Sequence, residues 1–198
     1  MPMLSIALLI AAQAVSALSD TAGLGFSFTA TSSDATSATV CISGKVAQNS
    51  YIGLGIATTP SAGAGMSGAD ITIVYPDAAN AVKVIHGAGA GHVFTADSSV
   101  LTLTSASSYS NGVLNACFTR PMAASGAGSL ALVNGPAGYI WATGAVSNGV
   151  PSQHAQKGSI ANANLFAAQA PAAPSKTGSA AGNTLLSAFG LILAAVVV

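Results

Sequence analysis

The amino-acid sequence predicts an all-β protein built as an antiparallel β-sandwich. The middle of the chain is a series of short runs rich in Val, Ile, Leu, Thr and aromatic residues. Clusters of Gly, Pro, Asn and Asp separate these runs at nearly regular intervals, a spacing that is typical of sandwiches and barrels. No stretch in this part of the chain keeps helical periodicity for three turns.

The expected strands follow one another along the chain, and each is dominated by β-branched, aliphatic or aromatic residues that suit a pleated, half-buried surface. In chain order they comprise residues 37–46, 51–57, 69–76, 81–87, 99–110, 112–120, 129–135 and 139–146. The pair Asn111-Gly112 is a strong signal for a tight hairpin, because both residues tolerate positive φ. We therefore expect residues 99–110 and 112–120 to pair.

The start of the chain is predicted to be a signal for secretion. Residues 1–17 form an apolar run that ends in small residues, and Val15-Ser16-Ala17 fits a small-residue cleavage site. Only the terminal amine supplies positive charge before this run. The folded domain is then expected to extend over residues 18–167.

The end of the chain is predicted to carry a GPI-attachment signal. Residues 168–184 are rich in Ala, Pro, Ser and Gly, which cannot bury a core, so they are expected to form a linker. Residues 185–198 are apolar but fewer than the ~20 residues that a spanning helix needs. Small residues, a polar spacer and an apolar tail match a GPI signal. The alternative is a weak tail anchor or a buried terminal helix.

Charge is scarce and balanced. Charged residues make up 5% of the chain, and the formal net charge is zero. Nucleic-acid binding depends on clustered Lys and Arg, so the composition gives no support to that function. The sequence contains no glutamate and relies on Ser, Thr, Asn and Gln for its polar surface. This composition suits an extracellular protein on a glycan-rich surface. Together with the two terminal signals, it leads us to expect a secreted protein at the outer face of the plasma membrane or cell wall, attached to the membrane only through its lipid.

The two cysteines, Cys41 and Cys117, lie on strand-like segments. In an oxidising compartment an even pair of this kind is expected to form a disulfide, and only one pairing exists. The alternative is a pair of buried free thiols.

The sequence was compared with three patterns of known function, and in each case the surrounding residues do not support that function. Residues 63–68 match G-x-G-x-x-G, but a strand rather than a helix follows them, so dinucleotide binding is not expected. No serine lies in a G-x-S-x-G elbow, so the sequence gives no specific support for a hydrolase. His86 and His92 flank a glycine-rich segment, where surface or turn histidines are the ordinary interpretation and a metal pair is the alternative.

Met66 is the one large side chain among the glycines of residues 63–68. From spacing alone, it would fill a gap in a core. However, residues 51–55 ("YIGLG") and 66–70 ("MSGAD"), with residues 141–144 ("WATG") and "HAQKG" beginning at His154, resemble the cytochrome domain of cellobiose dehydrogenase and its relatives in the DOMON superfamily. The resemblance spans nearly the whole expected domain.

This resemblance implies a DOMON-type, immunoglobulin-like sandwich that holds a non-covalent haem b, with Met66 and His154 as axial ligands. Tyr51 stands where the family can carry a tryptophan. Methionine and histidine fill both axial positions and raise the reduction potential, which suits electron transfer. The expected partner is a redox protein or a small-molecule electron acceptor. No flavin domain is expected on this chain, so its status as an enzyme stays open.

The superfamily also contains sugar binders and members with altered ligands. The alternative function is therefore a haem-free module that binds cell-wall carbohydrate or serves as a structural wall protein. An absorption spectrum separates the two, because only the cytochrome has a Soret band.

Overall fold

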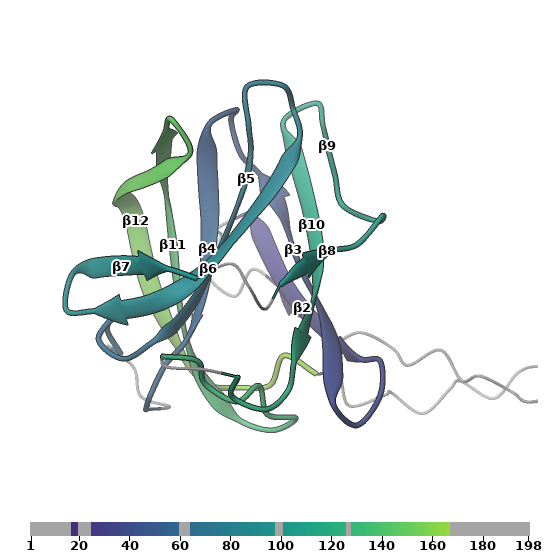
Figure 1. The fold of residues 1–198 in the computed structure, drawn as a ribbon, viewed down its shortest axis with the longest axis vertical. Helices are drawn as coiled ribbons and strands as arrows, with labels where there is room; N and C mark the ends of the chain where they lie inside the picture. Colours follow the sequence, from purple (N-terminus) through teal and green to yellow (C-terminus); the bar gives the residue numbers. More distant parts are fainter. Residues whose placement is uncertain (1–16, 20–24, 60–63, 98–100, 126–127, 167–198) are drawn as a thin grey trace, which may run out of the picture.

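Alternating buried and exposed residues build two antiparallel sheets that pack face to face (Figure 1). The computed structural model describes residues 17–19, 25–59, 64–97, 101–125 and 128–166. These residues form strands and connecting loops, with no helix among them and hence none long and apolar enough to cross a membrane. The predicted all-β, antiparallel sandwich is confirmed.

The strands vary greatly in length. In chain order they are β1 (Ala17–Ser19), β2 (Phe26–Ser32), β3 (Ser37–Lys45), β4 (Ser50–Ile56), β5 (Asp70–Pro76), β6 (Val82–Ala90), β7 (Val93–Ala96), β8 (Thr102–Leu103), β9 (Ser108–Ser110), β10 (Val113–Pro121), β11 (Ala137–Ser147) and β12 (Val150–Ala163). The first sheet has the order β1-β2-β3-β10-β8, and β9 also pairs with β10. The second sheet has the order β12-β11-β4-β5-β6-β7.

The main core lies between the two sheets. Every second residue of β3 and of β10 points inward, as the two-residue period of a strand requires. The largest fully buried side chains of the chain are mostly aromatic or branched aliphatic, and include Tyr139, Phe28, Phe118, Ile42, Ile52, Leu114, Leu165, Val40 and Val74. One face of the second sheet is therefore occupied by the main core, and the opposite face points away from the first sheet.

The predicted tight hairpin is present. Val113 pairs with Ser110, and the two residues between them, Asn111 and Gly112, have φ values of 52° and 75°. Both residues therefore adopt the left-handed conformation that a type I′ turn requires.

Two expected strands differ in the structure. Residues 99–110 contain only the short strands β8 and β9 within their described part. Residues 129–135 form no strand. Their backbone groups make hydrogen bonds to side chains and to a loop, and not to a neighbouring β-strand. Leu130 donates its N–H to the Asp70 carboxylate, its carbonyl accepts from Arg120, and Leu132 donates to the carbonyl of Met122.

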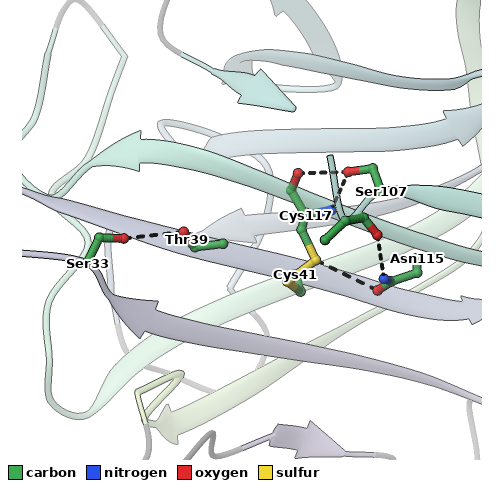
Figure 2. Close-up of a disulfide and its surroundings, with 7 residues drawn as sticks. Ser33, Thr39, Cys41, Ser107, Asn115 and Cys117 are labelled. Atoms are coloured by element: carbon green, nitrogen blue, oxygen red, sulfur yellow. Dashed lines mark hydrogen bonds between the residues drawn. A yellow bond between two sulfur atoms is a disulfide. The ribbon is translucent and has the colours of Figure 1, made fainter. Parts of the chain in front are cut away.

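The expected disulfide is confirmed. Cys41 of β3 and Cys117 of β10 are directly paired across neighbouring strands, and their sulfur atoms are bonded (Figure 2). The bridge thus links two strands of one sheet, on the face away from the core. Ser107 closes over it, because its hydroxyl donates to the carbonyl of Cys117 and accepts from the N–H of the same residue.

Removing the disulfide should lower stability strongly. The two cysteines are 76 residues apart, and closing a loop of this size stabilises a fold by about 4 kcal/mol in the chain-entropy model. The double variant Cys41→Ser/Cys117→Ser should therefore unfold at clearly lower urea concentration than the unchanged protein. Finding two titratable thiols in the denatured, unreduced wild-type protein would contradict the bridge.

The predictions for the ends fall mostly outside the described residues. This applies to the signal peptide up to residue 16, the linker and the GPI tail. The described chain ends with Phe166, which forms a bridge to Ala30 of β2.

Candidate functional site

The face of the second sheet that points away from the core carries its own group of apolar side chains. We call this group the outer apolar cluster. Its buried members are Tyr51, Ala69, Ile71, Ile73, Tyr75, Ile140 and Val146. In Figure 1 the two edge strands of this sheet, β7 and β12, both lie at the left of the view, so the sheet curves around this face. A group of apolar side chains that lies outside the main core suits contact with an apolar ligand or cofactor.

Met66 lies in the loop between β4 and β5 and packs against the outer apolar cluster. Its side chain is half-buried. Its carbonyl accepts a hydrogen bond from the N–H of Ala69 at 2.9 Å, which closes a tight turn just before β5. The thioether is thus held at the edge of an apolar surface and has no hydrogen-bond partner in the described chain.

His154 lies on β12, the edge strand of the same sheet. It pairs with Gly144 of β11, and Gly144 pairs with Tyr51 of β4. Directly paired residues share one face of a sheet, so His154 belongs to the face that carries Tyr51. The ring is half-buried, and no hydrogen bond joins it to any residue within the described ranges.

The two candidate ligands occupy the same face but opposite ends of it. Met66 lies beside Gly89, beyond the first paired residue of β5, whereas His154 lies level with Tyr51 at the far end of β4. The outer apolar cluster fills the surface between them. The arrangement thus offers a thioether and an imidazole on either side of an apolar surface.

The glycines of the sequence motifs have packing roles. A Cβ at Gly144 would lie 2.7 Å from the ring of Tyr51, and a Cβ at Gly158 would lie 2.6 Å from the indole of Trp141. The absent side chains therefore let the two aromatic rings lie against the backbone of β11 and β12. Tyr51 faces the outer apolar cluster, whereas Trp141 packs into the main core against Phe26.

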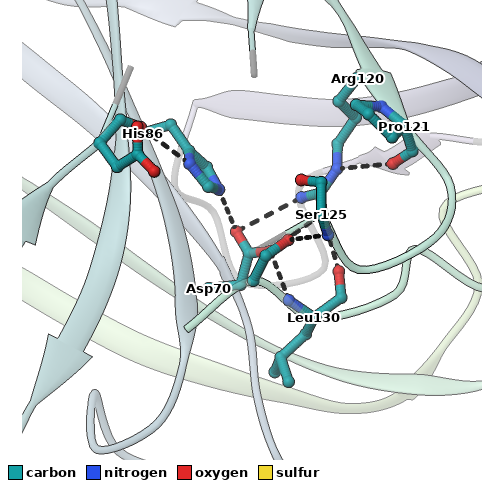
Figure 3. A network of polar contacts seen from close by, with 8 residues as sticks. Asp70, His86, Arg120, Pro121, Ser125 and Leu130 are labelled. Carbon is teal, nitrogen blue, oxygen red and sulfur yellow. Dashed lines mark hydrogen bonds and ion pairs between the residues drawn. The ribbon is translucent and has the colours of Figure 1, made fainter. Parts of the chain in front are cut away.

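A buried charged cluster ties the second sheet to the first (Figure 3). Asp70, the first residue of β5, accepts a hydrogen bond from Nη2 of Arg120 on β10 at 2.9 Å. Its other oxygen lies 2.7 Å from Nε2 of His86 on β6, and the N–H of Leu130 donates to the carboxylate at 2.7 Å. The side chain of Asp70 is 0% exposed. A buried carboxylate is tolerated only with this degree of compensation.

The pKa of Asp70 reflects two opposed effects. Burial alone would raise it, because a low-dielectric interior disfavours the charged form. The hydrogen bond from His86, the charge of Arg120 and the N–H of Leu130 outweigh burial, so the pKa lies below its ordinary value. Asp70 is therefore ionised in the folded protein at neutral pH.

The interpretation of His86 as a surface or turn histidine is wrong. His86 is 4% exposed and lies within β6, with Nε2 against Asp70 and Nδ1 2.9 Å from the carbonyl oxygen of Asp97. Both ring nitrogens are hydrogen-bonded, so neither is free to bind a metal. His92 is exposed in the turn between β6 and β7, and among the described residues no group of three His, Cys, Asp or Glu side chains could hold a metal ion.

Acidification should expose the contribution of Asp70. Because its folded pKa lies below the unfolded value of about 3.9, its stabilisation is complete above that value and is lost as the pH falls through the folded pKa. Asp70→Asn leaves Arg120 and His86 buried without an anion and should cost about 3–5 kcal/mol at neutral pH. The free energy of unfolding, measured with urea, should therefore fall less between pH 7 and pH 3 in the variant than in the wild type.

An equal loss of stability in both proteins would contradict this role of Asp70. Asp34 also has a lowered pKa, about 2, because Thr36 and Ser37 donate hydrogen bonds to its carboxylate. It is present in both proteins, so its effect cancels in the comparison.

A polar depression lies at the opposite end of the sandwich from Met66, between the turns that follow β3, β5 and β9. Its volume is about 740 Å³. The residues that line it are Ala47, Gln48, Asn80, Tyr109, Ser110, Asn111 and Gly112. Amide, hydroxyl and phenol groups therefore dominate this surface.

The two antiparallel sheets define the class of the fold, which is a β-sandwich of the kind found in cytochrome domains of dehydrogenases. The chain is similar to the cytochrome domain of cellobiose dehydrogenase from Myriococcum thermophilum, with a TM-score of 0.55 and 14% identity over 76% of this chain and 82% of that chain. It is also similar to the cytochrome b domain of pyranose dehydrogenase from Coprinopsis cinerea, with a TM-score of 0.51 and 11% identity over 68% and 73% of the two chains.

At these identities the likeness shows a shared fold, and the resemblance read from the sequence is confirmed at that level. No protein-family model matches the sequence. No curated protein matches it either.

Proposed function

We propose that this protein is a b-type cytochrome that transfers single electrons through a haem held by Met66 and His154. The observation that carries the proposal is the outer apolar cluster, which lies between a thioether and an imidazole on one face of one sheet. Two solved structures with this fold are cytochrome domains of dehydrogenases. That likeness supports the proposal. The thioether of Met66 and the imidazole of His154 also support it, because both groups are known ligands of haem iron.

The residues present fit haem b in their chemistry. Both donors are types that ligate haem iron, and neither has a competing hydrogen bond within the described chain. Aliphatic and aromatic side chains between them suit an apolar macrocycle. The chain contains no C-x-x-C-H sequence, so attachment would be non-covalent.

Each residue has a defined task in this proposal. Met66 and His154 would hold the haem through its iron, and two protein ligands of this kind would leave no open site for oxygen or substrate. The outer apolar cluster excludes water and lowers the local dielectric constant, which together with the thioether favours the reduced state. When bound, the haem supplies a one-electron couple. The acceptor is a redox protein or a small oxidant that approaches this face.

A stoichiometric titration tests the function. The haem-loaded protein, reduced and freed of reductant, should give up one electron per chain to a one-electron oxidant such as ferricyanide. Removal of one electron should restore the oxidised spectrum completely. Transfer of no electrons, or turnover that consumes oxygen continuously, would refute an electron-transfer role.

We further propose that the protein is secreted and held at the outer face of the plasma membrane or cell wall by a GPI lipid. The support is the signal-like sequence of residues 1–17 and the tail signal of residues 185–198. A phosphatidylinositol-specific phospholipase should release the protein from intact cells. If only detergent releases it from cells whose known GPI proteins respond to the enzyme, a peptide anchor is present instead.

The alternative function, a haem-free module that binds cell-wall carbohydrate, has one supporting observation. The polar depression offers the amides of Gln48, Asn80 and Asn111 and the ring of Tyr109, groups that hydrogen-bond and stack with sugars. This function predicts saturable binding of a wall polysaccharide and no Soret band. Loss of that binding in Tyr109→Ala, with haem binding absent in the wild type, would favour it.

A further inference from the structure

The loop that carries Met66 is attached to the fold at two points. The first is Gly89 on β6, and the second is Asp70 at the start of β5. Only three residues separate Met66 from Asp70, so any shift of either point moves the thioether. The consequence for haem binding rests on the proposed function, in which Met66 is an axial ligand.

Gly89 lets the Met66 loop lie against β6. The N–H of Gly68 donates to the carbonyl of Gly89 at 2.8 Å, and the N–H of Gly89 donates to the carbonyl of Ala69 at 2.9 Å. A Cβ at Gly89 would overlap the carbonyl oxygen of Met66 itself. The close approach of the loop to the strand therefore requires glycine at this position.

Asp70 fixes the other end of the loop from inside the sandwich. Its carboxylate is anchored by Arg120, which belongs to the opposite sheet, and by His86 on the neighbouring strand. Arg120 is 6% exposed and also donates to the carbonyl of Leu130. A side chain of the first sheet is therefore bonded to the residue at which β5 begins, directly after the Met66 turn.

We propose that Gly89 and the Asp70–Arg120 ion pair position Met66, so that the strength of its bond to haem iron depends on a residue of the opposite sheet. Neither Gly89 nor Arg120 contacts the haem in this account. They are positioning residues that act through the loop of residues 66–69.

Two glycines of the same strand provide a matched test. A Cβ at Gly87 overlaps the carbonyl oxygen of Thr95, as a Cβ at Gly89 overlaps that of Met66. Both Gly→Ala changes therefore strain β6 to a similar degree, but only Gly89→Ala pushes on Met66. Added imidazole, which competes with Met66 for the iron, should half-saturate Gly89→Ala at a concentration lower by about tenfold or more, equivalent to ~1.4 kcal/mol. A Cβ at Gly87 also meets the ring of Phe94, which packs against the outer apolar cluster, so this variant controls for strain in β6 and in that cluster. Its half-saturating imidazole concentration should stay close to that of the wild type.

Arg120→Gln tests the coupling between the sheets. The control is Cys41→Ser/Cys117→Ser, which weakens the same sheet without touching Asp70. Both should unfold at lower urea concentration, but only Arg120→Gln should bind imidazole more readily and show a lower reduction potential. Equal imidazole binding in Gly89→Ala, Gly87→Ala and wild type, or equal behaviour of Arg120→Gln and the disulfide variant, would overturn the proposal.

A measurement on the haem-free protein separates this inference from the proposed function. The Cε methyl resonance of Met66 should move toward its random-coil position in Gly89→Ala and Arg120→Gln but not in Gly87→Ala. If wild-type protein binds no haem, the cytochrome function fails, while the methyl shifts still decide whether these residues position Met66. Unchanged shifts in both variants would show that they do not.

Discussion

His154→Ala is expected to abolish haem binding or to weaken it by at least about 100-fold, because changes outside the ligand shell already cost 10–100-fold in metal affinity. The substitution removes an imidazole for which the neighbours on β12, Gln153, Ala155 and Gln156, offer no replacement. The half-buried ring contributes little to the core, so the variant should fold. Titration of haem into the purified variant, followed at the Soret band, measures the loss.

His92→Ala is the matched control for this experiment. His92 is an exposed histidine in a turn, and its removal should leave both haem affinity and spectrum unchanged. His86→Ala is unsuitable as a control, because His86 is buried against Asp70 and its loss would destabilise the fold. Haem loss in His92→Ala together with full binding in His154→Ala would show that the wrong histidine has been assigned.

Replacing Met66 should alter the iron without removing the haem. Met66→His should stay six-coordinate and low-spin, and its potential should fall by on the order of 0.1 V within the ~0.8 V range that axial ligands control. Imidazole favours ferric iron more than a thioether does. Met66→Ala should open a coordination position and give a high-spin or water-ligated ferric spectrum. Potentiometric titration with optical detection records both results.

Met122→Leu is the control for these two variants. Met122 lies just after β10 and packs against the main core, away from the outer apolar cluster. Its replacement by leucine conserves volume, so spectrum and potential should both be those of the wild type. An unaltered spectrum in Met66→Ala would refute the assignment of the methionine.

The sequence was sufficient to predict the central strands and the disulfide. Strands β3, β4, β5, β10 and β11 are rich in β-branched and aromatic residues, so their period and composition agree with the fold. Asn111-Gly112 specifies its turn through the two residues alone. The cysteine pairing followed from the compartment and from the count of two.

Other elements depend on contacts that no local pattern reveals. Strand β12 contains mostly small or polar residues, and it forms because it is the edge partner of β11 along almost its whole length. The apolar run at residues 129–135 has the composition of a strand, but the side chains of Asp70 and Arg120 form hydrogen bonds with its backbone. In both cases tertiary pairing overrides intrinsic propensity.

The candidate site was predictable only in part. The resemblance supplied Met66 and His154, and the sequence motif also contained Asp70, but nothing local to Asp70 indicates a partner 50 residues away on another sheet. The sequence predicted an exposed His86 because a glycine-rich run follows it directly. The sequence did contain one signal for the role of Asp70, namely the scarcity of charged residues. In such a chain a charged residue is more often one half of a specific ion pair than part of a solvated surface.

The most direct test is a titration of haem b into the purified protein, with absorption spectra of the oxidised and reduced forms. A Met66/His154-ligated cytochrome should bind one haem per chain and show a low-spin Soret band, with sharp α and β bands on reduction. A titration without saturable binding, or a spectrum that is high-spin and five-coordinate in both oxidation states, would contradict that account.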